Sequence, residues 1–376
     1  MPGNKSSQPI CKLCGQPILG SYFTALGGTW HPEHFVCAAC NQPISDARFN
    51  VHEGVAYHSG CYRDRVAPRC ASCGKPLLGE YLSHGGATYH SECYRDRVAP
   101  RCAYCHEPLL GQFVRHDGIA YHSECYRDRV APRCAYCHEP LLGKYLEDHW
   151  GTNFCEKHRD EYPTCSFCGR LVPPQQQKAG AKSNGDIRCP ICIGSAIETP
   201  TEAQPIFTRM QRWVKSQGLT YANLPFSLEL CDRTKLTQLL KGRGGTDTLG
   251  VTLSTIHTLN GQEVRTEING IAVLKGLPST LFQGVLVHEL GHVWLVLHGV
   301  KGLPSWAEEG FCELLSHRYY TELATVEAGY HAKGIEQSSD PVYGEGFRRV
   351  RSLANSIGFQ RLVETLATTK RLPTPS

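Results

Sequence analysis

The sequence of 376 residues has little that would place it in a membrane or outside the cell. No apolar run approaches the length needed to span a bilayer, and the first ten residues lack the apolar segment of a secretory signal. These absences predict a cytoplasmic protein without membrane contact, in which thiols stay reduced. Only two methionines and a hydrophobic content of 41% leave room for one sizeable core but not for a core along the whole chain. We therefore expect two or more domains.

Cysteine, by contrast, is abundant. The chain has twenty cysteines, and eighteen of them occur in closely spaced pairs with each other or with histidine. In a chain without a secretory signal, such spacing predicts zinc rather than disulfides. Four thiolate or imidazole ligands make a closed tetrahedral site that fixes structure and leaves no position open. The pairs define six such sites, here called knuckles, with these ligands: Cys11, Cys14, His31, His34; Cys37, Cys40, His58, Cys61; Cys70, Cys73, His90, Cys93; Cys102, Cys105, His122, Cys125; Cys134, Cys137, Cys155, His158; and Cys165, Cys168, Cys189, Cys192.

The first two knuckles are joined more closely than the others. Only two residues separate His34 from Cys37, and Trp30 precedes the first histidine pair. This pattern resembles a LIM domain. After the second knuckle the sequence Cys-Tyr-Arg-Asp-Arg-Val-Ala-Pro-Arg-Cys recurs with a period of 32, which indicates stacked copies of one small unit. The expected order is a disordered tail (1–10), a LIM domain (11–61), two LIM-like knuckles (62–128) and two further LIM-like knuckles (129–192).

The alternative to structural zinc is a collection of free buried thiols or redox switches. Six sites in a row use eighteen cysteines and six histidines with no ligand left over, which favours zinc. Each knuckle is too small to bury a core of its own, so the metal is expected to supply its folding energy.

The repeated Arg-Asp-Arg sequence could be either a basic stripe for nucleic acid or a solvated connector. Each copy carries its own aspartate and few aromatic residues accompany it, which favours the connector. The formal net charge is only +4, and it falls to about zero once six zinc-bound knuckles and a seventh zinc are counted. We therefore expect no nucleic-acid partner.

A second kind of metal site is predicted in the apolar segment 281–297, which contains His288-Glu289-Leu-Gly-His292. On a helix, the two histidines project from one face a single turn apart and can hold one zinc ion, while Glu289 is placed to take a proton from its bound water. The alternative is a buried histidine pair satisfied by hydrogen bonds. Because the segment is apolar nearly all round, such a pair would carry a heavy desolvation cost without a metal.

The third ligand is expected from the segment 304–310, a helix start with acidic residues behind Pro304 and Ser305. Glu309 is our first choice and Glu308 the reserve. The sequence Trp-x-x-Glu-Gly resembles the glutamate helix of zincin peptidases, in which the residue before the glycine is the ligand.

Two cysteines lie outside the knuckles. Cys231 falls in a strand-like segment and is expected to be a small core residue. Cys312 lies one turn beyond Glu309 and is interpreted as packing, with a role near the metal as the alternative.

The remaining C-terminal sequence alternates strand and helix signals. We expect a linker at 193–202, a helix at 205–217, strands at 226–231, 249–254 and 264–274, and helices at 346–356 and 359–367. Asn260-Gly261 predicts a hairpin turn between the last two strands. In zincin peptidases an edge strand ahead of the zinc helix pairs with extended substrate, and we expect the strand 264–274 to take this position.

Taken together, these motifs resemble those of the DA-one family, the LIM-domain, ubiquitin-activated zinc peptidases that limit organ growth in plants. The resemblance is carried by Gly276-Leu-Pro278, His-Glu-x-x-His-x-Trp-Leu-x-Leu297, Gly299, Glu308-Glu309-Gly310-x-Cys312 and Tyr343-Gly-Glu-Gly-Phe-Arg348. It implies an intracellular zinc peptidase of the gluzincin type, with protein substrates and with ubiquitin or ubiquitylated proteins as partners. Two features depart from the pattern: the knuckle array is longer, and we find no acidic ubiquitin-interacting helix at the N-terminus.

The predicted fold class is α+β, a tandem array of LIM and LIM-like knuckles followed by a zincin-like metallopeptidase domain at 203–376. Zinc is held by His288, His292 and Glu309, and Glu289 is the general base. Tyr343 or His331 would stabilise the oxyanion, with Tyr343 preferred for its place in the shared motif. The alternative is a non-catalytic LIM-type adaptor whose zincin-like domain acts as a brace. A zinc-binding array for nucleic acid is a further alternative, and so is a complete site that is occluded until a partner moves the knuckles.

Overall fold

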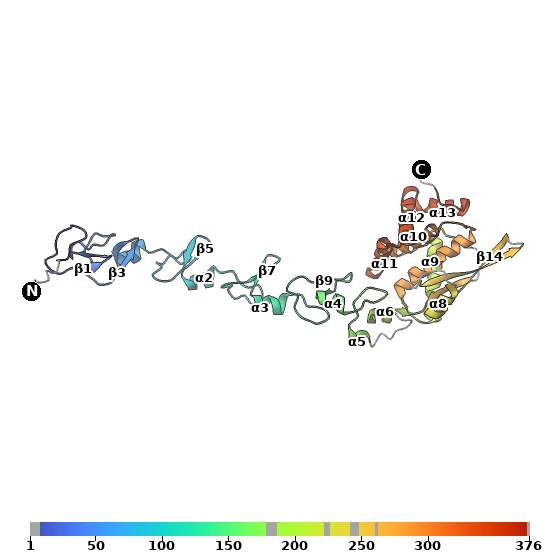
Figure 1. Cartoon of the computed structure of the whole chain (residues 1–376), viewed down its shortest axis with the longest axis horizontal. Coiled ribbons are helices and arrows are strands. Elements are labelled where there is room, and N and C mark those ends of the chain that lie inside the picture. Colours follow the sequence, from blue (N-terminus) through green and yellow to red (C-terminus); the bar gives the residue numbers. More distant parts are fainter. Residues whose placement is uncertain (1–7, 178–185, 222–225, 241–247, 260–261, 374–376) are drawn as a thin grey trace, which may run out of the picture. The chain divides into compact units, whose positions relative to one another are not determined.

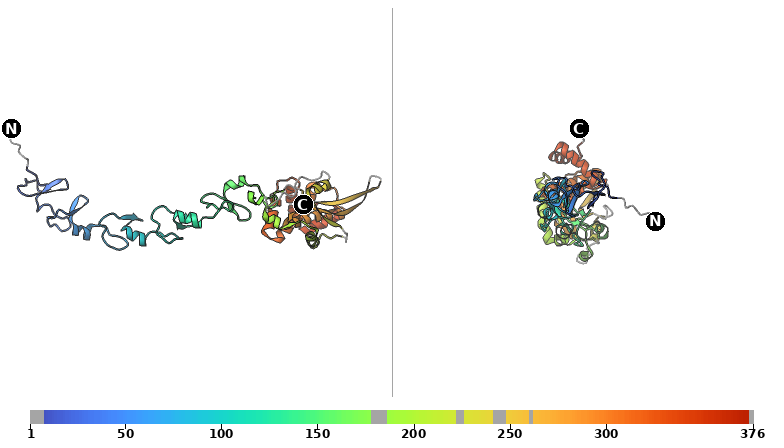
Figure 2. Two further views of the ribbon diagram at one scale, coloured as in Figure 1. Left: turned by 90° about the horizontal axis from the view of Figure 1, so that it is seen from below. Right: turned by 90° about the vertical axis from the view of Figure 1, so that its left-hand side faces the viewer.

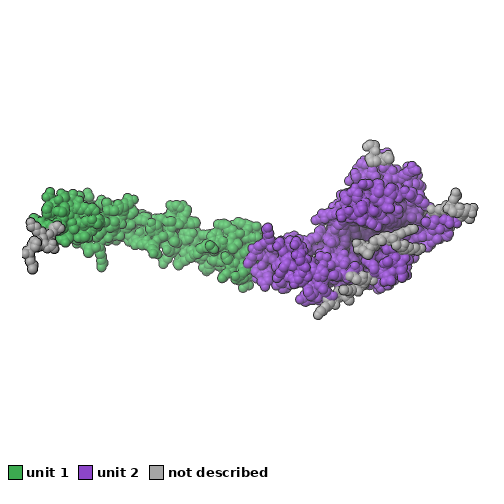
Figure 3. All heavy atoms as spheres, in the orientation of Figure 1, with its two compact units in different colours: residues 1–131 green, residues 132–376 purple. Residues whose placement is uncertain are grey.

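The computed structural model describes residues 8–177, 186–221, 226–240, 248–259 and 262–373 (Figure 1). The chain forms two compact units, Met1–Ala131 and Pro132–Ser376, here called unit 1 and unit 2 (Figure 3). The expected mixture of helix and strand behind a run of Cys/His knuckles is confirmed.

Each knuckle of unit 1 is built on a short antiparallel hairpin, followed in the second to fourth knuckles by a helical turn. The hairpins are β1 (Phe23–Ala25) with β2 (Gly28–Trp30), β3 (Phe49–His52) with β4 (Val55–His58), β5 (Leu82–His84) with β6 (Ala87–Tyr89), and β7 (Val114–His116) with β8 (Ile119–Tyr121). The turns are α1 (Ser59–Cys61) with the π-helical η1 (Tyr62–Val66), α2 (Ser91–Arg97), and α3 (Ser123–Cys125) with the π-helical η2 (Tyr126–Val130). The predicted tail at 1–10 is too long, because Ile10 bridges Pro17 within the first knuckle; residues 1–7 lie outside the described residues.

The repeated arginines bond to the chain around them. Arg101 donates to the backbone carbonyls of Asp96 (2.9 Å) and His106 (3.0 Å), and so ties the end of α2 to the next knuckle. Arg69 makes the same two contacts one repeat earlier, at 2.8 Å and 3.3 Å. The other arginines of the motif include Arg95, which pairs with its neighbour Asp96 at 2.8 Å. These contacts are those of a connector.

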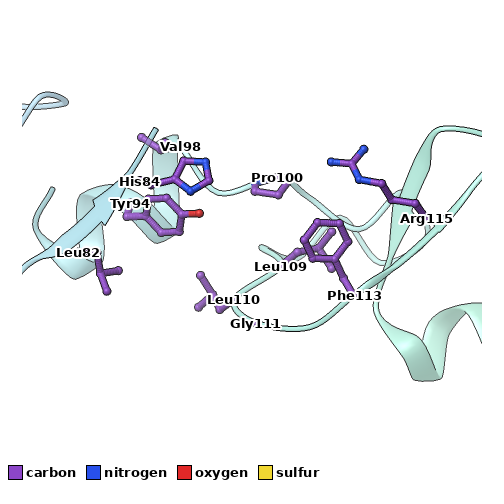
Figure 4. Close-up of a pocket in the computed structure, with 10 residues that line it drawn as sticks. All are labelled: Leu82, His84, Tyr94, Val98, Pro100, Leu109, Leu110, Gly111, Phe113 and Arg115. Atoms are coloured by element: carbon purple, nitrogen blue, oxygen red, sulfur yellow. The ribbon is translucent and has the colours of Figure 1, made fainter. Parts of the chain in front are cut away.

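A groove lies between the third and fourth knuckles (Figure 4). Its ten lining residues are mostly apolar, include Arg115, and contain no carboxylate. His84 and Tyr94 lie against each other at one end, with ring centroids 5.3 Å apart. The groove therefore offers apolar surface and no set of metal ligands.

Unit 2 begins with the last two knuckles. The fifth has the hairpin β9 (Leu146–Glu147) and β10 (Asn153–Phe154) and the helix α4 (Glu156–Glu161); the sixth has α5 (Pro174–Gln177) and α6 (Pro190–Gly194). The four cysteines of the sixth knuckle belong to the main hydrophobic core of unit 2. This knuckle is therefore packed into the C-terminal half of the chain.

The hairpin tip of the fifth knuckle is docked on the helix α11 (Val326–Gln337). The ring of Trp150 lies 5.4 Å from the ring of Tyr330, and its Nε1 donates to the carbonyl of Cys168 (3.0 Å). The guanidinium of Arg170 stands over the same indole at 3.6 Å. Asp148 shapes the tip by accepting the amide of Trp150 at 2.9 Å. The docked tip joins the fifth knuckle, the sixth knuckle and α11.

The segment 193–202 is ordered, and the prediction of a linker there is wrong. β11 (Ala196–Ile197) pairs antiparallel with β15 (Leu277–Pro278). Directly after it, Thr199 and Glu202 form a capping box that starts α7 (Pro200–Ser216) five residues before the predicted start. The sequence contains this capping pattern. The predicted start was too late because Pro205 was taken as the first residue of the helix, whereas it lies inside it.

The sheet of unit 2 has three strands in the order β12-β14-β13. β12 (Ser227–Cys231) runs parallel to β14 (Gln262–Leu274), and β13 (Gly250–Leu259) runs antiparallel to it. Between these parallel strands the chain passes through α8 (Arg233–Leu240), which was not predicted, and then through β13. β14 is therefore the central strand over Gly270–Leu274, where the expectation of an edge strand is wrong, and among the described residues 262–268 pair with β13 alone. Asn260 and Gly261 lie outside the described residues. The outer parts of β13 and β14 extend beyond the helices of unit 2 (Figure 2).

Helices account for the rest of unit 2: α9 (Ser279–Leu297), α10 (Ser305–Leu323), α11, α12 (Gly344–Ile357) and α13 (Phe359–Thr369). Among the described residues, α9 alone is long and apolar enough to cross a membrane, by length and composition, so the expectation that no run reaches that length is wrong. Within the fold 61% of its apolar window is buried, as in the core helix of a folded domain. α9 is the helix on which the predicted metal site stands.

Candidate metal centre

Two helices supply the predicted metal ligands. His288 and His292 project from α9 one turn apart, with ring centroids separated by 5.0 Å. Glu309 lies near the start of α10, which packs beside α9 with Phe311 in the common core. The structure thus brings together the three residues that the sequence selected.

Three electron-pair donors converge at this point. Nε2 of His292 lies 3.2 Å from Nε2 of His288, and Oε2 of Glu309 lies 3.1 Å from the first histidine's Nε2 and 3.3 Å from the second's. Ligand atoms about 2.0–2.2 Å from a tetrahedral zinc ion stand roughly 3.3–3.5 Å apart. The distances between the three donor atoms are therefore close to those found around a tetrahedral zinc ion.

The outer nitrogens of both histidines have carboxylate partners. Nδ1 of His288 lies 3.3 Å from Oε1 of Glu313, and Nδ1 of His292 lies 3.1 Å from Oε1 of Glu308. With the proton on Nδ1, each ring turns a free lone pair at Nε2 toward the centre. Two such lone pairs and a carboxylate oxygen form a donor set that can bind a cation. Glu308, the reserve candidate for the third ligand, contacts a histidine instead.

The charge around the site also favours a cation. Burial alone would lower the pKa of His288, but the carboxylates of Glu309 and Glu313 outweigh burial and raise that pKa well above its ordinary value. Burial would raise the pKa of Glu309, yet the two imidazoles hold it below its ordinary value. The side chains of the three ligands keep 14%, 15% and 22% of their surface exposed, so water reaches them. The donor set and its surroundings fit zinc with a fourth position for water.

The glycine after Glu309 allows a very close helix contact. A Cβ on Gly310 would lie 2.4 Å from the carbonyl of Gly346 on α12, and a Cβ on Gly346 would lie 2.1 Å from the carbonyl of Trp306 on α10. The two backbones touch because neither residue has a side chain. The position of Glu309 along α12 is fixed by this contact.

Glu289, the predicted general base, is 5% exposed and faces the strand β13. The hydroxyl of Thr252 lies 2.8 Å from its Oε2 and 3.0 Å from its backbone carbonyl. A Cβ on Gly250 would lie 3.0 Å from its Oε1. Glu289 is therefore held against a strand that sequence reasoning did not connect with the site.

Of the two candidates for oxyanion stabilisation, Tyr343 lies at the site. Its ring stacks on that of His288 with centroids 6.3 Å apart, and burial, aided by nearby carboxylates, raises its pKa to about 12. His331 stacks instead on Tyr320 in α10 at 5.3 Å, and burial lowers its pKa to about 4. His331 belongs to the packing of α11.

The two cysteines outside the knuckles are both buried. Cys312 lies beside the metal site, in hydrogen-bonding contact with His292, and its Sγ fills the space over Gly291. Cys231 ends β12 and donates to the carbonyl of Val273 at 3.6 Å. Cys231 has the predicted role of a core residue, and Cys312 both packs between helices and adjoins a ligand.

In each of the first five knuckles, the four predicted ligands lie together, with their ligand atoms within 4.8 Å of one another. In the sixth knuckle, Sγ of Cys168 lies 3.6 Å from Sγ of Cys189. Clusters of this kind are consistent with zinc-binding LIM domains.

Three contributors to the site and its surroundings were missed by sequence reasoning. Glu313 stands four residues after Glu309 and so shares its helical face, a spacing that could have identified it. Thr252 could not have been identified, because only the tertiary fold brings β13 to α9. Trp150 could not have been assigned to its dock for the same reason.

Comparisons with known proteins show similarity to LIM domains and to DA1-like proteins. A family model described as DA1-like, Protein DA1, matches residues 227–330, and a LIM domain model matches residues 11–66. The chain is similar to Protein DA1 of Arabidopsis thaliana, with 24% identity over 97% of this chain and 68% of that protein. Protein DA1-related 1 of the same plant is 24% identical over 98% of this chain and 67% of its own length. LIM domain-containing protein HDR3 of Oryza sativa subsp. japonica is 24% identical over 97% and 74%.

Proposed function

This chain combines a DA1-like domain with a LIM domain, and from that premise we propose that unit 2 is a zinc-dependent endopeptidase of the gluzincin type. Its substrates would be selected proteins inside the cell, in the cytoplasm, and the knuckles would regulate the peptidase or recruit partners. Ubiquitin or ubiquitylated proteins are the proposed activating partners, and neither nucleic acid nor membrane is a proposed partner.

One observation carries this proposal. His288, His292 and Glu309 bring three donor atoms within 3.1–3.3 Å of one another, while the outer nitrogen of each histidine faces a carboxylate. A buried histidine pair that served only packing would be satisfied by proton donors and acceptors in alternation. Three converging acceptors fit a metal with three protein ligands and one open position.

The chain's own residues then have distinct tasks. Zinc bound to the three ligands supplies Lewis-acid chemistry, which lowers the pKa of water and polarises a carbonyl. The carboxylate of Glu289, next to the ligand His288, accepts a proton from the attacking water and returns it to the leaving amine. Tyr343 keeps its hydroxyl proton at neutral pH because its pKa is about 12, and can donate a hydrogen bond to a developing oxyanion.

The test compares the zinc-loaded chain with its Glu289→Gln variant. Each is incubated with cell lysate, with and without ubiquitin chains, and new protein N-termini are sequenced. We expect new termini from the parent only, and seven zinc ions per chain from both proteins by elemental analysis. Equal cleavage by both proteins would exclude Glu289 as the base. Six zinc ions and no cleavage would leave the adaptor function.

A further inference from the structure

Strand β13 approaches the site at Glu289, the proposed general base. Gly250 and Thr252 are two positions apart on this strand, so both face the same side of the sheet. Their partners Val273 and Ile271 on the central strand fix that register. The side toward which they face is occupied by α9 and its Glu289.

Thr252 contacts the carboxylate of Glu289, and Gly250 leaves room for that side chain and for Val285, whose Cγ1 would lie 2.8 Å from a Cβ on Gly250. Thr252 donates its hydroxyl toward Oε2 of Glu289 at 2.8 Å. Gly250 leaves open the space beside Oε1 and Cγ, where a Cβ would stand 3.0 Å and 3.1 Å away. The φ of Gly250 is not positive, so the absence of a side chain matters here for room rather than for backbone conformation.

Thr252 has a single proton for two acceptors. The backbone carbonyl of Glu289 lies 3.0 Å from the hydroxyl, and the carboxylate lies closer. A charged carboxylate forms the stronger hydrogen bond, so the proton is directed to Oε2 while Glu289 is ionised. Among the described residues, Thr252 is the side chain that holds this carboxylate.

We infer that Gly250 and Thr252 form a cradle that positions Glu289 for proton transfer, with Oε2 held by the hydroxyl and Oε1 left free. This inference rests on the proposed peptidase function for its kinetic consequence. Thr252 is a positioning residue, because it acts through Glu289 and has no assigned contact with substrate. A carboxylate displaced by about 1 Å can slow a reaction about 100-fold.

The matched variants are Thr252→Val, which keeps the shape and removes the hydroxyl, and Thr252→Ser, which restores it. With a peptide substrate that the parent cuts, we expect Thr252→Val to lower kcat about 10- to 100-fold, with KM and the zinc content unchanged. Thr252→Ser should recover most of the rate. As a control for folding, the melting temperatures of both variants are compared with that of the parent. An unchanged kcat in Thr252→Val would overturn the cradle.

A second measurement decides the cradle without any hydrolysis. Crystal structures of the zinc-loaded parent and Thr252→Val should show the carboxylate of Glu289 displaced in the variant, with His288, His292 and Glu309 in place. Gly250→Ala places a methyl 2.8 Å from Val285 Cγ1 and 3.0 Å from Oε1 of Glu289, and we expect both side chains to be displaced from the strand. A parent that cuts nothing would refute the peptidase proposal alone, whereas a carboxylate that stays in place in both variants would refute the cradle.

Discussion

The third and fifth knuckles share a zinc-binding pattern but end in different hairpin tips. In the third, the strand β5 that leads to the tip has all three residues exposed, Leu82 to His84. In the fifth, the tip carries Trp150, which packs against Tyr330 and Arg170. The fifth knuckle is thus packed into a larger domain by an aromatic residue at its tip, whereas the strand leading to the tip of the third knuckle is exposed.

The hydrophobic surroundings of the knuckle cysteines also differ between the two units. The second knuckle is stabilised by a small cluster around Phe35 and Ile44. The sixth places all four cysteines in the main core of unit 2, beside residues such as Phe207 and Leu277. Loss of zinc should therefore remain local in unit 1 and spread through unit 2. Four of the five tryptophans lie in unit 2, so tryptophan fluorescence reports mainly on that unit.

The largest effect is expected from Cys192→Ser, which removes a predicted zinc ligand that is 3% exposed. We expect the free energy of unfolding of unit 2 to fall by about 4 kcal/mol or more, because a metal site within its core is lost. Denaturant unfolding followed by tryptophan fluorescence measures this. Cys73→Ser in the third knuckle is the control and should leave the unit 2 transition unchanged; an equal shift from both would remove the distinction between the units.

The next effect concerns pH and His331. Its pKa is about 4 in the folded chain and about 6.5 when exposed, so the unfolded chain binds the proton more tightly. The associated stability is complete above pH 6.5 and is lost as the pH falls toward 4. Between pH 7 and pH 5, we expect the parent to lose about 2 kcal/mol that a His331→Phe variant keeps.

That difference is measured by unfolding in excess zinc at both pH values. His84→Phe, at an exposed histidine of the third knuckle, should not alter the pH dependence of unit 2. Parallel pH profiles for the parent and His331→Phe would show that the buried histidine makes no such contribution.

Trp150→Ala should undock the tip of the fifth knuckle. It removes the indole that contacts both Arg170 and Tyr330, and with it the hydrogen bond to the carbonyl of Cys168. Because the ring is partly exposed, we expect a loss of about 2 kcal/mol, below the range for a fully buried tryptophan. The control is Tyr145→Ala in the same knuckle, an exposed aromatic residue. Hydrogen exchange should quicken in α11 for the first variant only, and slow exchange in both would contradict the dock.

The smallest effect is expected in unit 1 from Arg101→Gln, which removes the two hydrogen bonds that tie the fourth knuckle to α2. Because these bonds are exposed to solvent, we expect local protection to fall by about 1 kcal/mol. Hydrogen exchange of the amides around Cys102 measures the change. Arg95→Gln, which loses only a contact with the adjacent Asp96, is the control. Equal exchange in the two variants would show that the connector contacts do not hold the knuckles together.

Local spacing predicted the parts of the structure that depend on local geometry. The histidine pair four residues apart, and the acidic residue before Gly310, gave three residues that the structure brings together. The knuckle ligands followed from the Cys-x-x-Cys pairs and the 32-residue period. A helical turn or a zinc hairpin determines such distances by itself, so no tertiary information was needed.

Strand order and docking required the whole fold. We predicted an edge strand at 264–274 because it precedes the zinc helix, but β12 pairs in parallel with its last five residues, Gly270–Leu274. For the same reason β13, and with it Thr252, was not placed near Glu289. The ordered segment after the sixth knuckle was mistaken for a linker because its two-residue strand β11 is too short to show a pattern.

The glycine contact between α10 and α12 limits how this protein could be switched on. The backbones of Gly310 and Gly346 are in direct contact, and no side chain lies between them that could change its rotamer. Glu309, the proposed third ligand, therefore cannot leave the site unless α10 and α12 separate. In the proposed peptidase, a signal that moves the ring of Tyr343 away from His288 would change access to the site without separating these two helices. In such a design the metal stays in place through both states, and access to it is what changes.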